Sequence, residues 1–91
     1  MKLELRIDKI LNELNNLIKN IDEIKLDKMN MTIHQFKKIV YELEQMKKYL
    51  SPKEFRPSYV HIIIDSWDFK EEKELHDELL KIESDYTKIG K

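Results

Sequence analysis

The stretch RPSYVHIIIDSWDF, residues 56–69, decides the fold class of this chain. Its apolar run from Tyr59 to Ile64 has the residue types of a buried β-strand, for which Leu3–Ile7 would be the candidate partner. As a short helix, the same run would be apolar on most sides and would lie centrally in a bundle. We favour the helix, because the neighbouring segments all have helical patterns and hairpin turns are absent. An α+β fold with a short strand at 59–64 is the alternative.

Before this stretch, apolar residues recur in alternating steps of four and three, which is typical of one face of a long helix. We therefore expect a first helix from about Lys2 to Lys28. The residues on that face are Leu3, Ile7, Ile10, Leu14, Leu17, Ile21 and Ile24.

A second long helix is predicted to begin at Thr32. Thr32 has the type of an N-cap, Gln35 completes a capping box, and Met31 and Phe36 are spaced for a hydrophobic staple. A connection of about three residues would turn this helix back antiparallel on the first. After it, Ser51-Pro52-Lys53-Glu54 predicts a single turn, because Pro57 disfavours a longer helix.

The last helix is predicted to begin at Asp68, with Glu71 at the capping-box offset. Its apolar face skips the positions between Trp67 and Leu75, so either the helix breaks near Asp68 or its first two turns project from the core. The sequence thus predicts a single all-α domain over residues 1–91. Its expected architecture is a small antiparallel helical bundle of three long helices plus one short helix.

Composition excludes several classes of chemistry. The 91 residues include no cysteine and one glycine, so disulfides, thiolate chemistry and glycine-rich phosphate loops are absent. Two of the three histidines lie four residues from a carboxylate, His76 from Glu72 and His61 from Asp65, a spacing expected by chance in a chain with 18 acids. We therefore predict no catalytic residues, no metal site and no cofactor.

Lysine and isoleucine are abundant and alanine is absent, which indicates an AT-rich coding genome of a low-GC bacterium or its phage. The opening MKLELRID mixes acids and bases, unlike a signal peptide, and no apolar stretch is long enough to span a membrane. A cytoplasmic location in a bacterial or phage-infected cell is the resulting expectation.

Charge is unevenly distributed along the chain. Residues 1–64 carry 12 basic and 9 acidic side chains, whereas residues 65–91 carry 5 and 9, for a total of −1. Four acids in the last helix recur on one face and predict a negative stripe, which is either an ordinary solvated face or a surface that binds a basic partner. They are Glu71, Glu74, Glu78 and Asp85.

Aromatic residues concentrate just before that helix. Arg56, Tyr59, Trp67 and Phe69 are of types that anchor interfaces, and they are also what a small core needs for closure. Core is the favoured interpretation for the aromatic group as a whole. Because Trp67 and Phe69 flank the break in the apolar pattern, we expect at least one of the two to stay exposed and contact a partner.

These features favour a non-enzymatic protein-binding module that occludes or regulates a larger partner with a basic surface. Phage anti-defence inhibitors, immunity proteins and regulatory adaptors are of this type. A self-associating helical protein, pairing as a homodimer along the first helix, is one alternative. Nucleic-acid binding through the lysines of the helix after Thr32 is another, which the near-neutral net charge disfavours.

Overall fold

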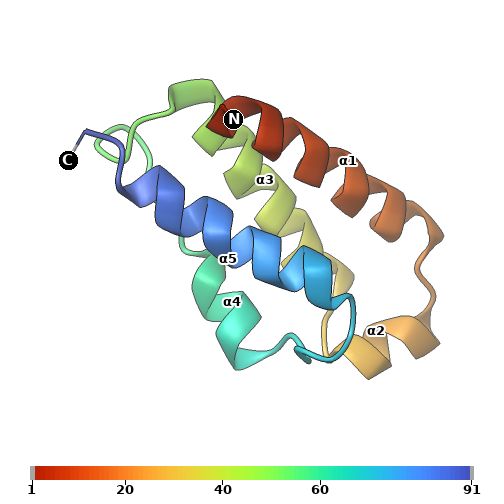
Figure 1. The fold of residues 1–91 in the computed structure, drawn as a ribbon. Coiled ribbons are helices and arrows are strands. Elements are labelled where there is room, and N and C mark those ends of the chain that lie inside the picture. Colours follow the sequence, from red (N-terminus) through yellow and green to blue (C-terminus); the bar gives the residue numbers. More distant parts are fainter. Residues whose placement is uncertain (1, 91) are drawn as a thin grey trace.

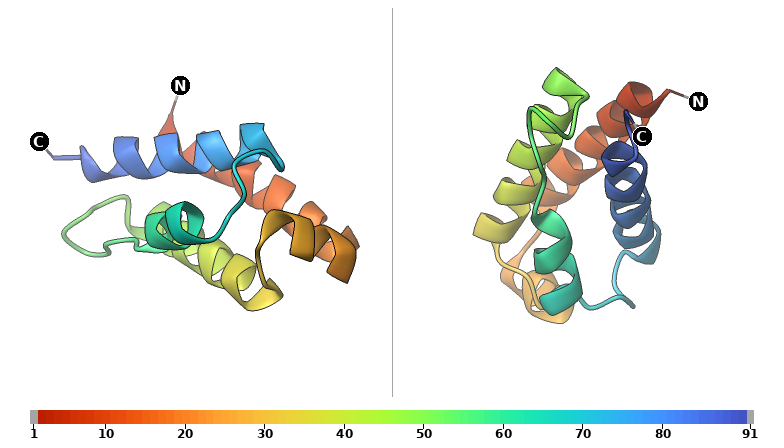
Figure 2. Two further views of the ribbon diagram at one scale, coloured as in Figure 1. Left: turned by 90° about the horizontal axis from the view of Figure 1, so that it is seen from below. Right: turned by 90° about the vertical axis from the view of Figure 1, so that its left-hand side faces the viewer.

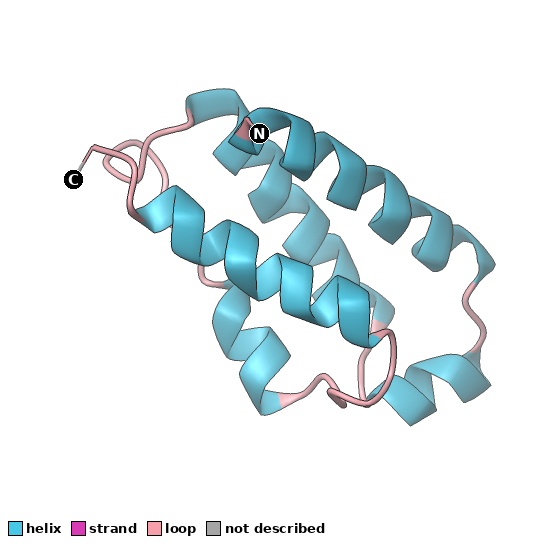
Figure 3. Ribbon diagram, viewed as in Figure 1, coloured by secondary structure: helices cyan, strands magenta, loops and turns pink. Residues whose placement is uncertain are grey.

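Five helices make up the computed structural model, which describes residues 2–90 (Figures 1 and 3). They are α1 (Leu3–Asn20), α2 (Glu23–Met29), α3 (Ile33–Tyr49), α4 (Tyr59–Asp65) and α5 (Lys73–Thr87). No strand occurs among residues 2–90, so the predicted all-α fold is confirmed. The stretch at 59–64 is helical, and the α+β alternative is wrong.

The three long helices form the body of the bundle, with α1 running opposite to α3 and α5 (Figure 1). Helix α1 packs against both α3 and α5, and the short α4 closes the remaining side between α3 and α5 (Figure 2). One hydrophobic core lies between these four helices. Its largest fully buried side chains include Tyr59, Tyr86 and Phe36.

The first helix is shorter than predicted, because the chain leaves helical geometry at Ile21 and Asp22. The Asn20 side chain donates to the carbonyl oxygen of Asn16 at 2.9 Å and so competes with the helical ladder. Asp22 then caps a new helix, since its side chain accepts from the backbone N–H of Lys25 at 2.8 Å. The expected helix to Lys28 is therefore two helices, and the bundle has two short helices instead of one.

The break also changes which residues are buried. Ile24, expected on the core face of a continuous helix, leaves 69% of its surface exposed on α2. Because α2 is a separate helix, the apolar face of α1 does not continue into it. In the residue range 2–90, no helix combines the length and apolar composition needed to cross a bilayer.

The start of α3 is as predicted. Thr32 accepts from the backbone N–H of Gln35 at 3.1 Å, and the Gln35 side chain accepts from the backbone N–H of Thr32 at 2.9 Å. Met31 and Phe36 are both buried, as the staple requires. The predicted single turn also forms after α3, because the carbonyl oxygen of Ser51 accepts from the backbone N–H groups of Glu54 and Phe55.

Helix α5 begins later than predicted, because its N-cap position is Glu72 and not Asp68. Asp68 caps a local turn instead of a helix, since its side chain accepts from the N–H of Lys70 and its carbonyl accepts from the N–H of Glu71. Glu72 then adopts a left-handed conformation with φ 50°, which ends the turn before α5 starts at Lys73. We call residues 66–72, which join α4 to α5, the linker loop.

Candidate functional site

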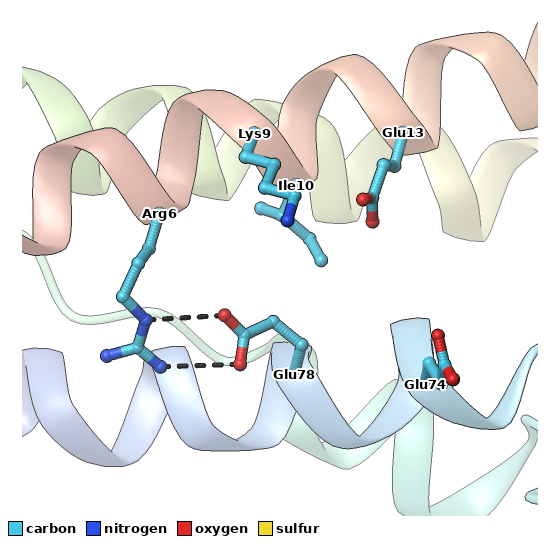
Figure 4. A pocket seen from close by; sticks show the side chains of 6 residues that line it. All are labelled: Arg6, Lys9, Ile10, Glu13, Glu74 and Glu78. Atoms are coloured by element: carbon cyan, nitrogen blue, oxygen red, sulfur yellow. Dashed lines mark hydrogen bonds and ion pairs between the residues drawn. The ribbon is translucent and has the colours of Figure 1, made fainter. Parts of the chain in front are cut away.

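Most of the predicted acidic stripe is occupied within the chain itself. The Arg6 guanidinium on α1 lies between two acids of α5, 2.6 Å from Asp85 and 3.3 Å from Glu78 (Figure 4 shows the Glu78 contact). Arg6 holds the pKa of the Asp85 carboxyl below its usual range, and the two acids raise the pKa of Arg6. These contacts attach α1 to α5.

Glu71 is engaged in a similar way at the other end of the stripe. The Lys25 ammonium on α2 lies 3.2 Å from Glu71 and 3.1 Å from Glu72, and the contacts with Glu72 and then Glu71 raise the pKa of Lys25. A basic surface for this stripe therefore exists inside the molecule, contributed by Arg6 and Lys25.

Glu74 is the stripe residue that stays exposed without a basic partner among the described residues. It borders a shallow groove of about 210 Å³ between α1 and α5, with Ile10 at its base (Figure 4). The other lining residues are Arg6, Lys9, Glu13 and Glu78. Two bases and three acids line this groove, so it has no single sign of charge.

Tyr59 belongs to the core, not to the surface predicted to bind a partner. Its side chain is fully buried and its hydroxyl donates to the carbonyl oxygen of Leu79 at 2.6 Å, which fixes α4 against α5. Burial raises the pKa of this hydroxyl well above its usual range. The apolar position of Tyr59 in the first turn of α4 explains the placement, since Tyr59 and Ile63 share one face and both are buried.

Trp67 is also buried, and the expectation that it contacts a partner directly is not supported. Its indole N–H donates to the carbonyl oxygen of Glu71 at 2.8 Å, across the linker loop. Its ring meets Phe36 and His76 edge to face, with centroid distances of 5.4 and 5.8 Å. Trp67 therefore anchors the linker loop to the hydrophobic core.

The linker loop is held in one conformation by α2, α3 and the residues between them. Asn30 donates to the carbonyl oxygen of Ser66 at 2.9 Å, and Gln35 donates to the Ser66 hydroxyl at 3.2 Å. The backbone N–H of Asp68 donates to the carbonyl oxygen of Met29 at 2.9 Å. Together with Lys25 and Trp67, these contacts order a segment that lies between two helices and outside both of them.

Two large apolar side chains project from this ordered region. Phe69 in the linker loop exposes 60% of its surface, and Ile64 in the last turn of α4 exposes 69%. Phe69 is thus the predicted aromatic that stays exposed. The sequence analysis did not single out Ile64, although the helical spacing could have done so. Ile63 points inward with Tyr59, so Ile64 is rotated by about 100° toward solvent.

Acidic residues flank these two apolar side chains in the sequence. From Ile64 to Glu74 inclusive the chain carries five acids and two lysines, and Lys25 neutralises part of that excess. The exposed acids of this segment are Asp65, Glu72 and Glu74. We call Ile64, Phe69 and these three acids the linker site. Arg56, the remaining predicted contact residue, is exposed in the loop between α3 and α4, outside the linker site.

Glu42 is a buried carboxylate that sequence analysis did not identify. It is 4% exposed and accepts from the backbone N–H groups of Ser58 and Tyr59, both at 2.7 Å, and from the Ser58 hydroxyl at 2.9 Å. Its carboxylate therefore caps the N-terminus of α4 from the neighbouring helix α3. By fixing the start of α4, Glu42 also sets the direction in which Ile64 points.

Few other reactive side chains lie close to one another among the described residues. Within residues 2–90, no three of the His, Asp and Glu side chains cluster in a way that could hold a metal ion. His76 contacts Asp77 at 2.9 Å, and the pKa of Asp77 is lowered by Lys73 and then by His76. Comparison with protein-family models, with curated proteins and with solved structures finds no match for this chain.

Proposed function

We propose that this chain is a non-enzymatic protein-binding module and that the linker site is its contact surface. The partner is a larger protein that offers an apolar pocket with basic side chains around its rim, and binding occludes that pocket. This assignment keeps the cytoplasmic inhibitor or adaptor role expected from the sequence. The observation that carries it is an exposed phenylalanine presented by a loop that other elements hold rigid.

Rigidity matters because a mobile loop loses conformational entropy on binding, whereas an ordered loop has lost it during folding. Exposed apolar residues are ordinary when they are scattered over mobile surface. Here Phe69 lies between two anchored residues, Asp68 bonded to Met29 and Glu71 bonded to Lys25. The linker site is therefore preorganised for contact.

The size of Phe69 allows an estimate of its contribution. A side chain of roughly 200 Å² that is 60% exposed offers about 120 Å², or about 3 kcal/mol when buried at ~25 cal/mol per Å². Charge selects the partner, since Asp65 and Glu74, which form no ion pair among the described residues, would meet basic side chains around the pocket, with Glu72 beside Lys25 adding to the field. Phe69 would supply affinity, and the acids would supply orientation and speed of association.

The test is site-specific photo-crosslinking in cells of a low-GC bacterium. A benzoylphenylalanine placed at Phe69 should give one defined adduct with another protein. The same group at Tyr49, an aromatic position on α3 that is 41% exposed, serves as the matched control and should not give that adduct. Equal adducts from both positions, or an adduct only with a second copy of the chain, would overturn the proposal.

Purified partner then allows the affinity to be measured. Phe69→Ala should weaken binding at least tenfold, and Ile64→Ala should weaken it less. Ile89→Ala, at an exposed apolar position outside the linker site, should bind like the wild type. Raising the salt concentration should slow association, because the acids act through long-range attraction. Unchanged affinity for Phe69→Ala would refute the role of the linker site.

A further inference from the structure

The outer face shared by α1 and α3 has a composition unlike the rest of the molecule. On α1, Asn12, Asn15, Asn16 and Lys19 follow one another at steps of three, one and three, so they share one side of the helix. On α3, Lys37, Tyr41 and Lys48 also share one side. All seven residues are exposed. We call them the α1–α3 face.

The two helices place these residues side by side. Lys47 on α3 forms an ion pair with Asp8 on α1, and the helices pack antiparallel. Because both helices rise by 1.5 Å per residue, positions after Asp8 on α1 lie opposite positions before Lys47 on α3. Lys19 is eleven positions after Asp8, which brings it level with Phe36 and next to Lys37. The asparagines are level with the turn that carries Tyr41.

Carboxylates are scarce at the end of this face that carries Lys19 and Lys37. Residues 33–41 contain no acid, and residues 12–20 contain only Glu13, which lines the groove on the α5-facing side of α1. Lys19, Lys37 and Lys48 have no carboxylate within 4.0 Å among the described residues. The surface around Lys19 and Lys37 is therefore positive on a chain whose net charge is −1. At the other end, Glu44 is exposed on the same side of α3 as Tyr41 and Lys48, and Asp8 of α1 pairs with Lys47.

From this arrangement we infer that the α1–α3 face is a second interaction surface, which binds the sugar-phosphate backbone of single-stranded nucleic acid. Lysines contact phosphate groups, asparagine amides donate to phosphate or sugar oxygens, and the Tyr41 ring stacks on an unpaired base. Tyr41 is 56% exposed, which leaves its ring free for stacking. A duplex would offer no unpaired base to that ring.

Fluorescence anisotropy with labelled twenty-nucleotide oligonucleotides of thymidine and of uridine tests this inference. Each lysine that contacts a phosphate should contribute about −0.7 to the slope of the logarithm of affinity against the logarithm of salt concentration. Three lysines should therefore give a slope of about −2. Affinity should thus drop about sixteenfold between 50 and 200 mM salt. Comparing the two oligonucleotides shows whether the sugar contributes, and a duplex of the same length should bind more weakly.

Variants locate the contact on the molecule. Lys37→Ala should weaken binding and reduce the slope by about 0.7, and Tyr41→Ala should weaken binding about tenfold with the slope unchanged. Glu44→Gln should strengthen binding. Lys9→Ala changes an exposed lysine at the α1–α5 groove and is the matched control, with affinity expected to equal the wild type.

Three results would overturn the inference: no binding at 50 mM salt with protein at 200 μM, an equal loss for Lys9→Ala and Lys37→Ala, or a duplex that binds as tightly as the single strand. The linker site is tested separately. Phe69→Ala should leave oligonucleotide binding unchanged, so failure of this inference and failure of the proposed protein-binding function are distinguishable. Far-UV circular dichroism of each variant should match that of the wild type, which checks that the substitution leaves the helices intact.

Discussion

Removing the buried carboxylate of Glu42 should be among the most damaging single changes in this fold. In Glu42→Ala, the backbone N–H groups of Ser58 and Tyr59 both lose an acceptor at 2.7 Å, and the Ser58 hydroxyl loses one at 2.9 Å. Tyr59 is fully buried, so water cannot readily replace the acceptor for its N–H group. The first turn of α4 would also lose the negative charge at its N-terminus.

The cost follows from these contacts. An unsatisfied buried N–H costs about 1–3 kcal/mol, and a lost N-cap costs about 1 kcal/mol. Relief from burying the carboxylate offsets part of this, which leaves a net destabilisation of about 2 kcal/mol. For a domain of this size, about 2 kcal/mol corresponds to a drop of roughly 8–16 °C in melting temperature.

Thermal unfolding followed by circular dichroism and by Trp67 fluorescence measures this drop. Glu44→Ala is the matched control, because Glu44 lies on the same helix two residues away and is exposed. Its free energy of unfolding should change by about 0.5 kcal/mol or less. Glu42→Gln keeps one acceptor oxygen and should fall between the two. A Glu42→Ala melting temperature within about 2 °C of Glu44→Ala would show that the carboxylate does not hold α4.

Other contacts give smaller effects. Tyr86→Phe removes a hydroxyl that lies 2.7 Å from the carbonyl oxygen of Ser51 and 2.8 Å from that of Phe55, and urea unfolding should show a loss of about 1–2 kcal/mol. Thr32→Ala removes the N-cap of α3 and should lower the melting temperature by about 4–8 °C, measured by circular dichroism. Asp85 has a lowered pKa beside Arg6, so this pair stabilises the fold above about pH 4 and stops doing so as pH falls through that lowered pKa. Urea unfolding between pH 5 and pH 2 should therefore show a smaller loss of stability for Asp85→Asn than for the wild type.

The parts of the fold that sequence predicted correctly depend on neighbours a few residues apart. The capping box joins Thr32 to Gln35, and the turn after α3 joins Ser51 to Glu54. The break after Asn20 was missed although its signal is equally local. Asp22 has the type of an N-cap, but the apolar spacing continues unbroken through Ile21 and Ile24 and so favours a continuous helix.

The candidate site was predictable only in part because its determinants are distant in sequence. Arg6 pairs with Asp85 across 79 positions, and Lys25 pairs with Glu71 across 46. An acidic face on a helix has the same pattern whether its basic partner is another protein or another helix of the same chain. The spacing of apolar residues also cannot predict that Glu42 is buried. The backbone N–H groups that donate to its carboxylate belong to Ser58 and Tyr59, which lie 16 and 17 positions further along the chain.

The linker loop is where local sequence preference and the fold disagree most. Asp68 and Glu71 have the spacing of a helix start, yet the chain forms a turn there and places Glu72 in a left-handed conformation that costs roughly 1–2 kcal/mol for a residue with a side chain. Trp67 and Lys25 hold that conformation, and its effect is to keep Phe69 on the outside of the molecule. Natural sequences are locally consistent with their folds except at strained or functional positions. Asn30 and Leu50 also have positive φ, but Glu72 is the one of the three that lies in the linker loop, so its strain accords with the proposal that the linker site binds a partner.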